Sequence, residues 1–225
     1  MPSLLLIRHA QASFGAEDYD VLSDLGHDQV AALVAGLPAR GVRAARVVCG
    51  DLRRQRDTAG PCAEAFGVAL EVDPRWNEYV DRDVLTHHAT VPAGLDHHRG
   101  DATLSSREFQ DILNEAVRGW IAAGAEGPCE ETWPAFLARG EAALRDLAMS
   151  LGRGEVGIAV SSGGVIAALT AAMLELVPEA MIAFNHVSIN ASITKLTVGR
   201  GGVRVISVNE HAHLESGEGS LVTYR

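Results

Sequence analysis

Lysine is nearly absent from this chain of 225 residues, because Lys195 is the only one among 19 basic side chains and the other 18 are arginines. Because arginine takes the place of lysine throughout the chain, the number of arginines is weak evidence for phosphate binding. The 29 acidic residues give a net charge of −10, which argues against non-specific binding to nucleic acid or to anionic membranes. A small anionic substrate is compatible with this charge, because a local arginine pocket can operate in an acidic protein.

Cysteine is scarce as well, and Cys49, Cys62 and Cys129 are far apart in the sequence. Three cysteines without close spacing match neither a disulfide framework nor a metal-ligand motif. A reducing cytoplasm is the simplest setting for such a chain. No stretch approaches the ~18 apolar residues of a membrane span. The N-terminal apolar run is too short for a secretory signal and has no basic region before it. We therefore expect a cytoplasmic protein without a membrane or nucleic-acid partner.

Short apolar runs alternate with helical patterns along the chain. The runs predict strands at residues 3–7, 47–49, 68–72, 156–160, 192–198 and 203–208. Apolar stripes at helical spacing predict helices that begin near residues 23, 52, 105, 133 and 163 and end near residues 38, 66, 123, 151 and 176. This order predicts the α/β class, with three α/β/α layers and a mostly parallel central sheet that has helices on both faces. The last two strands are expected to form a hairpin at the sheet edge.

Residues 76–100 interrupt this alternation. The segment is polar and is expected to be a long loop or the base of an inserted lid. We predict a single domain over residues 1–225, with the lid or insertion at about 80–131. Two histidine pairs, His87-His88 and His97-His98, raise the alternative of a metal site, but their spacing matches no standard zinc motif. We therefore expect no metal.

An arginine and a histidine directly follow the first predicted strand, in Arg8-His9-Ala10-Gln11. The C-terminal ends of strands are where open α/β sheets place their ligands. The guanidinium fork of arginine fits phosphate oxygens, and histidine can act as nucleophile, acid or base. The pair indicates phosphoryl chemistry on a histidine. A solvated strand end is the alternative, because so short a motif is common.

Two further segments at strand ends suit the same chemistry. Residues 51–59 carry arginines in the first turn of a predicted helix, where they oppose the helix dipole unless an anion binds there. Glu78 follows the third strand beside Trp76 and Tyr79, and desolvation there can raise its pKa and make it a proton donor. The alternatives are an arginine cluster balanced by Asp51 and Asp57, and a plain surface glutamate.

Taken together and in order, five segments resemble the histidine phosphatase superfamily, which includes the cofactor-dependent phosphoglycerate mutases, and in particular its bacterial phosphatase-like members. They are residues 6–11, 22–29, 51–59, 77–78 and 160–164, and the resemblance extends from about residue 3 to 214. It implies that His9 is the nucleophile that becomes phosphohistidine and that Arg8 and Arg54 bind the phosphate. It also implies that Glu78 is the general acid and then the base. Because an arginine pocket neutralises charge on the phosphoryl oxygens, no metal or other cofactor is expected.

The chain departs from this family pattern at two positions. Ala10 replaces a glycine, which adds only one methyl group near the pocket. Ser162 replaces the second histidine of the family's phosphate pocket, and a serine supplies a neutral hydrogen bond in place of imidazolium charge. We expect Ser162 and Gly163 to bind phosphate in part, because Gly163 and Gly164 leave backbone amides free at a helix start. His186, expected on a loop before residue 192, is a candidate replacement for the missing histidine.

These residues predict a metal-independent phosphatase that hydrolyses a small phosphorylated metabolite through phospho-His9. Its activity is expected to be reduced, because losing one charged donor typically costs ~10²–10³ in rate. A phosphoglycerate mutase-type phosphotransferase is the first alternative. The second is a catalytically weak protein that binds a phosphorylated ligand or a protein partner. The presence of Arg8, His9, Arg54 and Glu78 together favours an enzyme, whereas Ser162 keeps the second alternative open.

Overall fold

The computed structural model describes residues 1–13, 20–89, 106–215 and 220–224. Its sheet has six strands in the order β3-β2-β4-β1-β5-β6. The strands are β1 (Ser3–Arg8), β2 (Ala44–Cys49), β3 (Leu70–Val72), β4 (Val156–Ser161), β5 (Ile193–Gly199) and β6 (Gly202–Glu210). The pairs among β1 to β4 are parallel, and β5 and β6 are antiparallel. The predicted mostly parallel sheet and its edge hairpin are confirmed.

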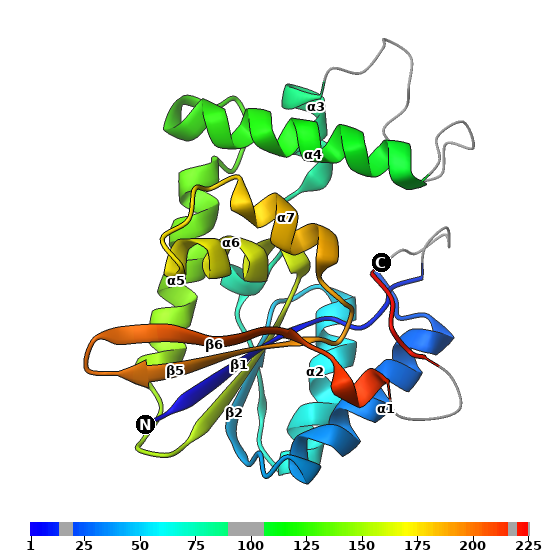
Figure 1. Cartoon of the computed structure of the whole chain (residues 1–225), viewed down its shortest axis with the longest axis vertical. Coiled ribbons are helices and arrows are strands. Elements are labelled where there is room, and N and C mark those ends of the chain that lie inside the picture. Colours follow the sequence, from blue (N-terminus) through cyan, green and yellow to red (C-terminus); the bar gives the residue numbers. More distant parts are fainter. Residues whose placement is uncertain (14–19, 90–105, 216–219, 225) are drawn as a thin grey trace.

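Helices cover both faces of this sheet (Figure 1). The helices are α1 (Asp24–Ala39), α2 (Arg53–Phe66), α3 (Asp81–His88), α4 (Ser106–Ala123), α5 (Trp133–Met149), α6 (Gly163–Met173) and α7 (Ala180–Val187). Successive side chains of β1 point to opposite faces, so Leu5 and Ile7 join the core beneath α1 and α2. Leu4 and Leu6 join the core that includes α4, α5, α6 and α7. The expected three-layer α/β/α fold follows from this alternation.

The start of α1 agrees with the sequence. The Ser23 side chain accepts a hydrogen bond from the backbone nitrogen of Gly26 at 3.0 Å, which makes it the N-cap.

Two helical segments differ from the sequence predictions. Helix α3 lies within the segment that was expected to be a loop. The segment is helical because Val84 and Leu85 pack in the core and acidic residues in the first turn suit the helix dipole. The helix expected to reach residue 176 ends at Met173, and Glu175 then adopts a left-handed backbone conformation with φ of 57°. The chain enters α7 afterwards, so His186 lies in the last turn of a helix and not on a loop.

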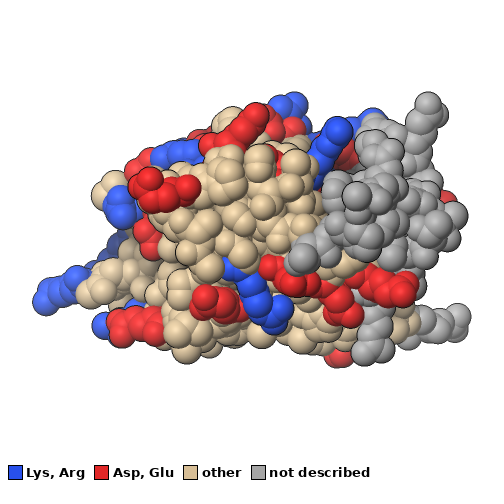
Figure 2. All heavy atoms as spheres, turned by 90° about the horizontal axis from the view of Figure 1, so that it is seen from above, with Lys and Arg blue, Asp and Glu red and all other residues tan. Residues whose placement is uncertain are grey.

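Helices α3 and α4 lie at one end of the molecule, beyond the edge of the sheet (Figure 1). Figure 2 looks down on this end and shows a broad area that carries neither basic nor acidic side chains. No helix among the described residues is long and apolar enough to cross a membrane. A single domain with an insertion at about 80–131 stays a prediction, and His97 and His98 lie outside the described residues.

An aromatic cluster fixes the chain that follows β3. Trp120 of α4 contacts Tyr79 with 5.3 Å between ring centroids, and it meets Trp133 of α5 edge-on at 5.4 Å. The indole nitrogen of Trp120 donates to the carbonyl of Glu131 at 2.9 Å, so the buried polar atom is satisfied. Since Tyr79 adjoins Glu78, this cluster anchors the segment that presents the Glu78 carboxyl group.

Candidate active site

The carboxyl ends of the central strands meet at one edge of the sheet. Arg8 of β1 pairs in register with Ser161 of β4, and Cys49 of β2 pairs with Val160 of β4. The residues that follow these strands therefore surround one space. Ligand sites in open α/β sheets lie at this position, outside the carboxyl ends of the strands.

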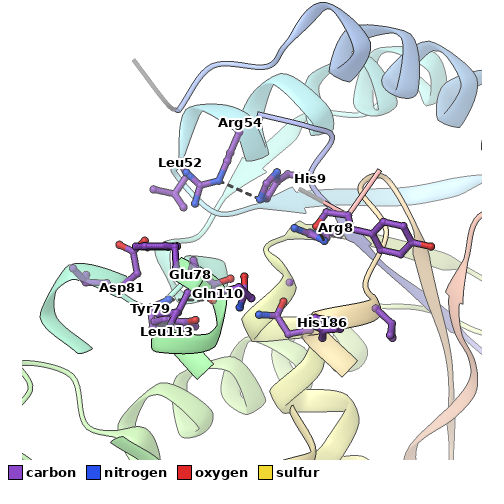
Figure 3. A pocket seen from close by; sticks show the side chains of 16 residues that line it. Arg8, His9, Leu52, Arg54, Glu78, Tyr79, Asp81, Gln110, Leu113 and His186 are labelled. Atoms are coloured by element: carbon purple, nitrogen blue, oxygen red, sulfur yellow. Dashed lines mark hydrogen bonds between the residues drawn. The ribbon is translucent and has the colours of Figure 1, made fainter. Parts of the chain in front are cut away.

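A pocket of about 740 Å³ opens at this edge. Its lining brings together the four side chains that the sequence singled out, Arg8, His9, Arg54 and Glu78 (Figure 3). Gly163 and His186 also line it, whereas Ser162 does not.

The backbone fixes both the place and the tautomer of His9. The residue is 6% exposed, and its backbone nitrogen donates to the carbonyl of Ser161 at 2.8 Å. Its ring atom Nδ1 lies 2.8 Å from the carbonyl oxygen of Ala10. Because a carbonyl oxygen can only accept, Nδ1 carries the proton and Nε2 keeps a lone pair. Nε2 is therefore the ring nitrogen with a lone pair available for a nucleophilic role.

Arg54 reaches the same ring from the first turn of α2. Its Nε donates to His9 Nε2 across 3.2 Å, and its Nη1 contacts Asp20 Oδ1 at 2.6 Å (Figure 3). Asp20 Oδ2 also accepts from the backbone nitrogen of Arg53 at 2.7 Å. The arginines at this helix start are thus offset by a carboxylate from another segment. Sequence reasoning missed Asp20, because nothing in the loop before α1 marks it as a partner of α2.

Arg8 is held by backbone oxygen atoms of two distant segments. Its Nη1 donates to the carbonyl of Ser188, which follows α7, and to the carbonyl of Tyr224 at 3.1 Å. These contacts fix the guanidinium at the pocket wall. The contribution of Tyr224 could not be read from the sequence, because the two residues are 216 positions apart.

A buried hydrogen-bond network ties residues 220–224 to the turn that carries His9. Asn190 donates to the carbonyl of His9 at 3.2 Å, and its Oδ1 accepts from Thr223 Oγ1 at 3.0 Å. Gln29 of α1 donates to Thr223 Oγ1 at 2.8 Å and accepts from the backbone nitrogen of Gln11 at 2.8 Å. Gln29 and Asn190 are completely buried. One network therefore positions the turn that carries His9 and the segment that holds Arg8.

Glu78 approaches the pocket from the segment before α3. Its Oε2 accepts from the backbone nitrogen of Gly164 at 2.8 Å, and its Oε1 accepts from that of Tyr79 at 3.2 Å. Burial raises the pKa of Glu78, while the Gly164 hydrogen bond and the charge of Arg54 act in the opposite direction. A Cβ at position 164 would lie 2.3 Å from Glu78 Oε1, so only glycine permits this approach. A carboxyl group with a raised pKa is suited to donate a proton.

Comparisons with known proteins place this arrangement in a family. The model of the histidine phosphatase superfamily (branch 1) matches residues 4–99 and 98–211. The chain belongs to this superfamily. It is 31% identical over 185 residues to the glucosyl-3-phosphoglycerate phosphatase of Mycobacterium tuberculosis (strain ATCC 25618 / H37Rv), covering 77% of this chain and 75% of the relative. The enzyme of the same name from Mycolicibacterium vanbaalenii is 29% identical over 198 residues, with 77% and 74% covered.

A solved structure agrees with these relatives. The mycobacterial glucosyl-3-phosphoglycerate phosphatase in complex with inorganic phosphate is 26% identical to this histidine phosphatase, with a TM-score of 0.63. The match covers 94% of this chain and 98% of the other. The predicted family, the fold class and the class of enzyme, a phosphatase of the histidine phosphatase type, are confirmed.

Ser162 of this histidine phosphatase does not present its hydroxyl group in the pocket lining. The residue is 1% exposed, and its Oγ accepts a hydrogen bond from Gln55 Nε2 at 2.8 Å. Gln55 is itself completely buried and donates to the carbonyl of Trp76 at 3.2 Å. Free backbone amides were expected at the start of α6. This expectation is wrong for Gly164, because its backbone nitrogen donates a hydrogen bond to Glu78. A phosphate-binding role for Ser162 and Gly163 stays a prediction.

His186 lines the pocket from the last turn of α7, next to Asn185. A Cβ at position 163 would lie 2.3 Å from Asn185 Oδ1, so the close approach of α7 to α6 depends on Gly163. His87 and His88 lie on α3. Within the described part of the chain, no group of three His, Cys, Asp or Glu side chains could hold a metal ion.

Proposed function

We propose that this histidine phosphatase hydrolyses a small phosphorylated metabolite through a phosphohistidine at His9, without a metal ion. The observation that carries the proposal is the tautomer of His9. The hydrogen bond from Nδ1 to the Ala10 carbonyl leaves the Nε2 lone pair facing Arg54. A nucleophile held in this way needs no prior deprotonation to attack phosphorus.

The first half of the reaction transfers the phosphoryl group to the enzyme. His9 Nε2 attacks phosphorus, and the bond between phosphorus and the ester oxygen breaks. The protonated Glu78 carboxyl donates its proton to that oxygen, so the alcohol leaves neutral. Arg8 and Arg54 stabilise the negative charge on the phosphoryl oxygens during transfer.

The second half returns the enzyme to its starting state. The Glu78 carboxylate takes a proton from water, and the oxygen of that water attacks the phosphorus of phospho-His9. The bond between Nε2 and phosphorus breaks, which releases inorganic phosphate and restores the neutral imidazole. Because Glu78 acts as acid and then as base, its raised pKa serves both halves.

Hydrolysis of 4-nitrophenyl phosphate tests this proposal. We expect turnover by the parent to survive dialysis against EDTA, because arginines replace a metal ion at the phosphate. His9→Ala should lower the rate by at least ~10³-fold, as expected for removal of a nucleophile. His27→Ala is the matched control, because His27 is exposed on α1 and outside the pocket lining. Activity lost with EDTA and restored by a divalent cation, or kept in His9→Ala, would overturn the proposal.

A further inference from the structure

The pocket changes character away from the four residues of the proposed reaction. Besides Leu52, which lies beside Arg54 in Figure 3, six lining residues are large and apolar or aromatic. We call these six the outer wall: Tyr79, Val80, Phe109, Leu113, Val187 and Tyr224. They come from the segment before α3, from α4, from the end of α7 and from residues 220–224. Figure 3 shows Tyr79 and Leu113 across the pocket from Arg54, His9 and Arg8.

Three members of the outer wall are unusually exposed for their type. Val80 is 63% exposed, Val187 is 50% exposed and Tyr224 is 55% exposed. Single exposed apolar side chains are common on protein surfaces and need no explanation. Three of them from separate segments, gathered around one pocket, present apolar surface that a bound molecule would bury.

The charged groups of the pocket point to the same kind of ligand. Among the described lining residues, the only arginine or lysine side chains are Arg8 and Arg54. Both belong to the phosphate end of the pocket, where they contact backbone carbonyls, His9 and Asp20. A carboxylate on the rest of the substrate would therefore find, among the described lining residues, no arginine or lysine beyond these two to pair with.

We propose that the alcohol released by this enzyme is uncharged and largely apolar, such as an aromatic or aliphatic alcohol, and carries no carboxylate. The inference rests on the proposed function, because it assumes that the phosphate occupies the end formed by Arg8, His9 and Arg54. Contact with the outer wall would then supply most of the binding free energy of the leaving group. The side chains of Gln110 and His186 offer hydrogen-bonding partners for a hydroxyl group beside it.

Two substrates with similar leaving-group reactivity provide the test. We compare kcat/KM for 2-phenylethyl phosphate and 3-phosphoglycerate, which are both esters of primary alcohols and differ in apolar surface and carboxylate charge. The parent enzyme is expected to prefer 2-phenylethyl phosphate by at least ~10-fold, since apolar contacts of this size discriminate by that order. A preference for 3-phosphoglycerate, or equal values for both, would overturn the inference.

A charge introduced into the outer wall sharpens the result. Val187→Arg places a cation at the pocket, and it should shift the preference toward 3-phosphoglycerate by ~10-fold. Val72→Arg is the matched control, because Val72 is an exposed valine on β3 that lies outside the lining of this pocket. It should leave the preference unchanged. An equal shift in both variants would contradict a local effect.

Binding without turnover separates this inference from the proposed function. Calorimetric titration of His9→Ala with each ester reports the dissociation constants in the absence of the nucleophile. Tighter binding of 2-phenylethyl phosphate supports the inference even where the chelator and His9 experiments fail. Tighter or equal binding of 3-phosphoglycerate overturns it, even where those experiments succeed.

Discussion

The two ends of the pocket are built in different ways. At the phosphate end, His9 is buried and oriented by backbone carbonyls, and Arg8 follows directly from a central strand. At the outer wall, Val80, Val187 and Tyr224 are half exposed and come from helices and segments at the periphery. Arg8 and His9, which we propose act in the reaction, are thus fixed to the sheet, whereas the groups that we propose select the substrate belong to elements packed around it.

After His9→Ala, the largest effect is expected for Glu78→Gln. The amide cannot donate the proton that the leaving alcohol needs, so kcat should fall by ~10²–10⁴-fold. Because burial raises the pKa of Glu78 from its ordinary value, the parent should lose the transfer step as the pH rises through that raised pKa. The variant should lack this descending limb in its pH profile.

The pH profile of kcat for an alkyl phosphate is the measurement, and Glu64→Gln on the exposed side of α2 is the control. A descending limb that persists unchanged in Glu78→Gln would show that another group supplies the proton.

A smaller loss is expected for Arg54→Ala, because Arg8, the other arginine that we propose binds the phosphate, is retained. We expect kcat/KM to fall by ~10²–10³-fold, as when one preorganised donor is removed from a transition state. Arg53→Ala is the matched control, since Arg53 has a side chain that is 61% exposed and lies outside the pocket lining. Equal losses in the two variants would point to a general effect of charge at the start of α2.

The next prediction concerns Ser162, whose neighbour Gln55 fills the space beside it. Ser162→His should lower the free energy of unfolding by ~1–3 kcal/mol, because an imidazole is too large for this fully packed place. Gln55→Ala in the same chain should relieve the crowding, with a coupling of ~0.5–3 kcal/mol between the two sites.

Denaturant unfolding of the parent, both single variants and the double variant gives this coupling. The inhibition constant for inorganic phosphate then reports whether the new imidazole reaches the pocket. Additive changes in stability would contradict the packing of Gln55 against Ser162.

The sequence was sufficient to place the residues that directly follow a predicted strand. Arg8 and His9 lie at the end of a buried strand, and Glu78 comes after the third strand of the chain. Their approach to one edge of the sheet could therefore be predicted. Asp20 and Tyr224 could not be found in this way, because their contacts join segments far apart in the chain. Helix α3 was missed because its buried residues, Val84 and Leu85, are too few to give a helical period.

Gln55 and Gln29 carried a signal that could have been used. Each is a polar residue on the inward face of its helix, four positions before the buried Ala59 and Leu33 respectively. A buried amide at such a position needs hydrogen-bond partners, and therefore marks a polar network. The partners themselves, Ser162 for Gln55 and Thr223 for Gln29, are set by the tertiary fold.

The smallest effect is expected for Thr223→Val, which removes a hydroxyl group from the network around the nucleophile. Loosening residues 220–224 should raise the inhibition constant for inorganic phosphate about two- to fivefold, the equivalent of ~0.5–1 kcal/mol. Thr197→Val is the control, because the hydroxyl group of Thr197, on β5, donates to the carbonyl of Pro2 outside the pocket lining. An unchanged inhibition constant in Thr223→Val would show that Arg8 does not depend on this network.

The most direct test of the account is the chemical identity of the phosphoenzyme. The EDTA-treated parent is mixed with a ³²P-labelled phosphate ester, quenched, and digested for mapping of the labelled peptide. If His9 carries the phosphoryl group, the label should survive alkali, be lost in acid, map to His9 and be absent from His9→Ala. A label that maps to another residue, or that persists in His9→Ala, would contradict this role of His9.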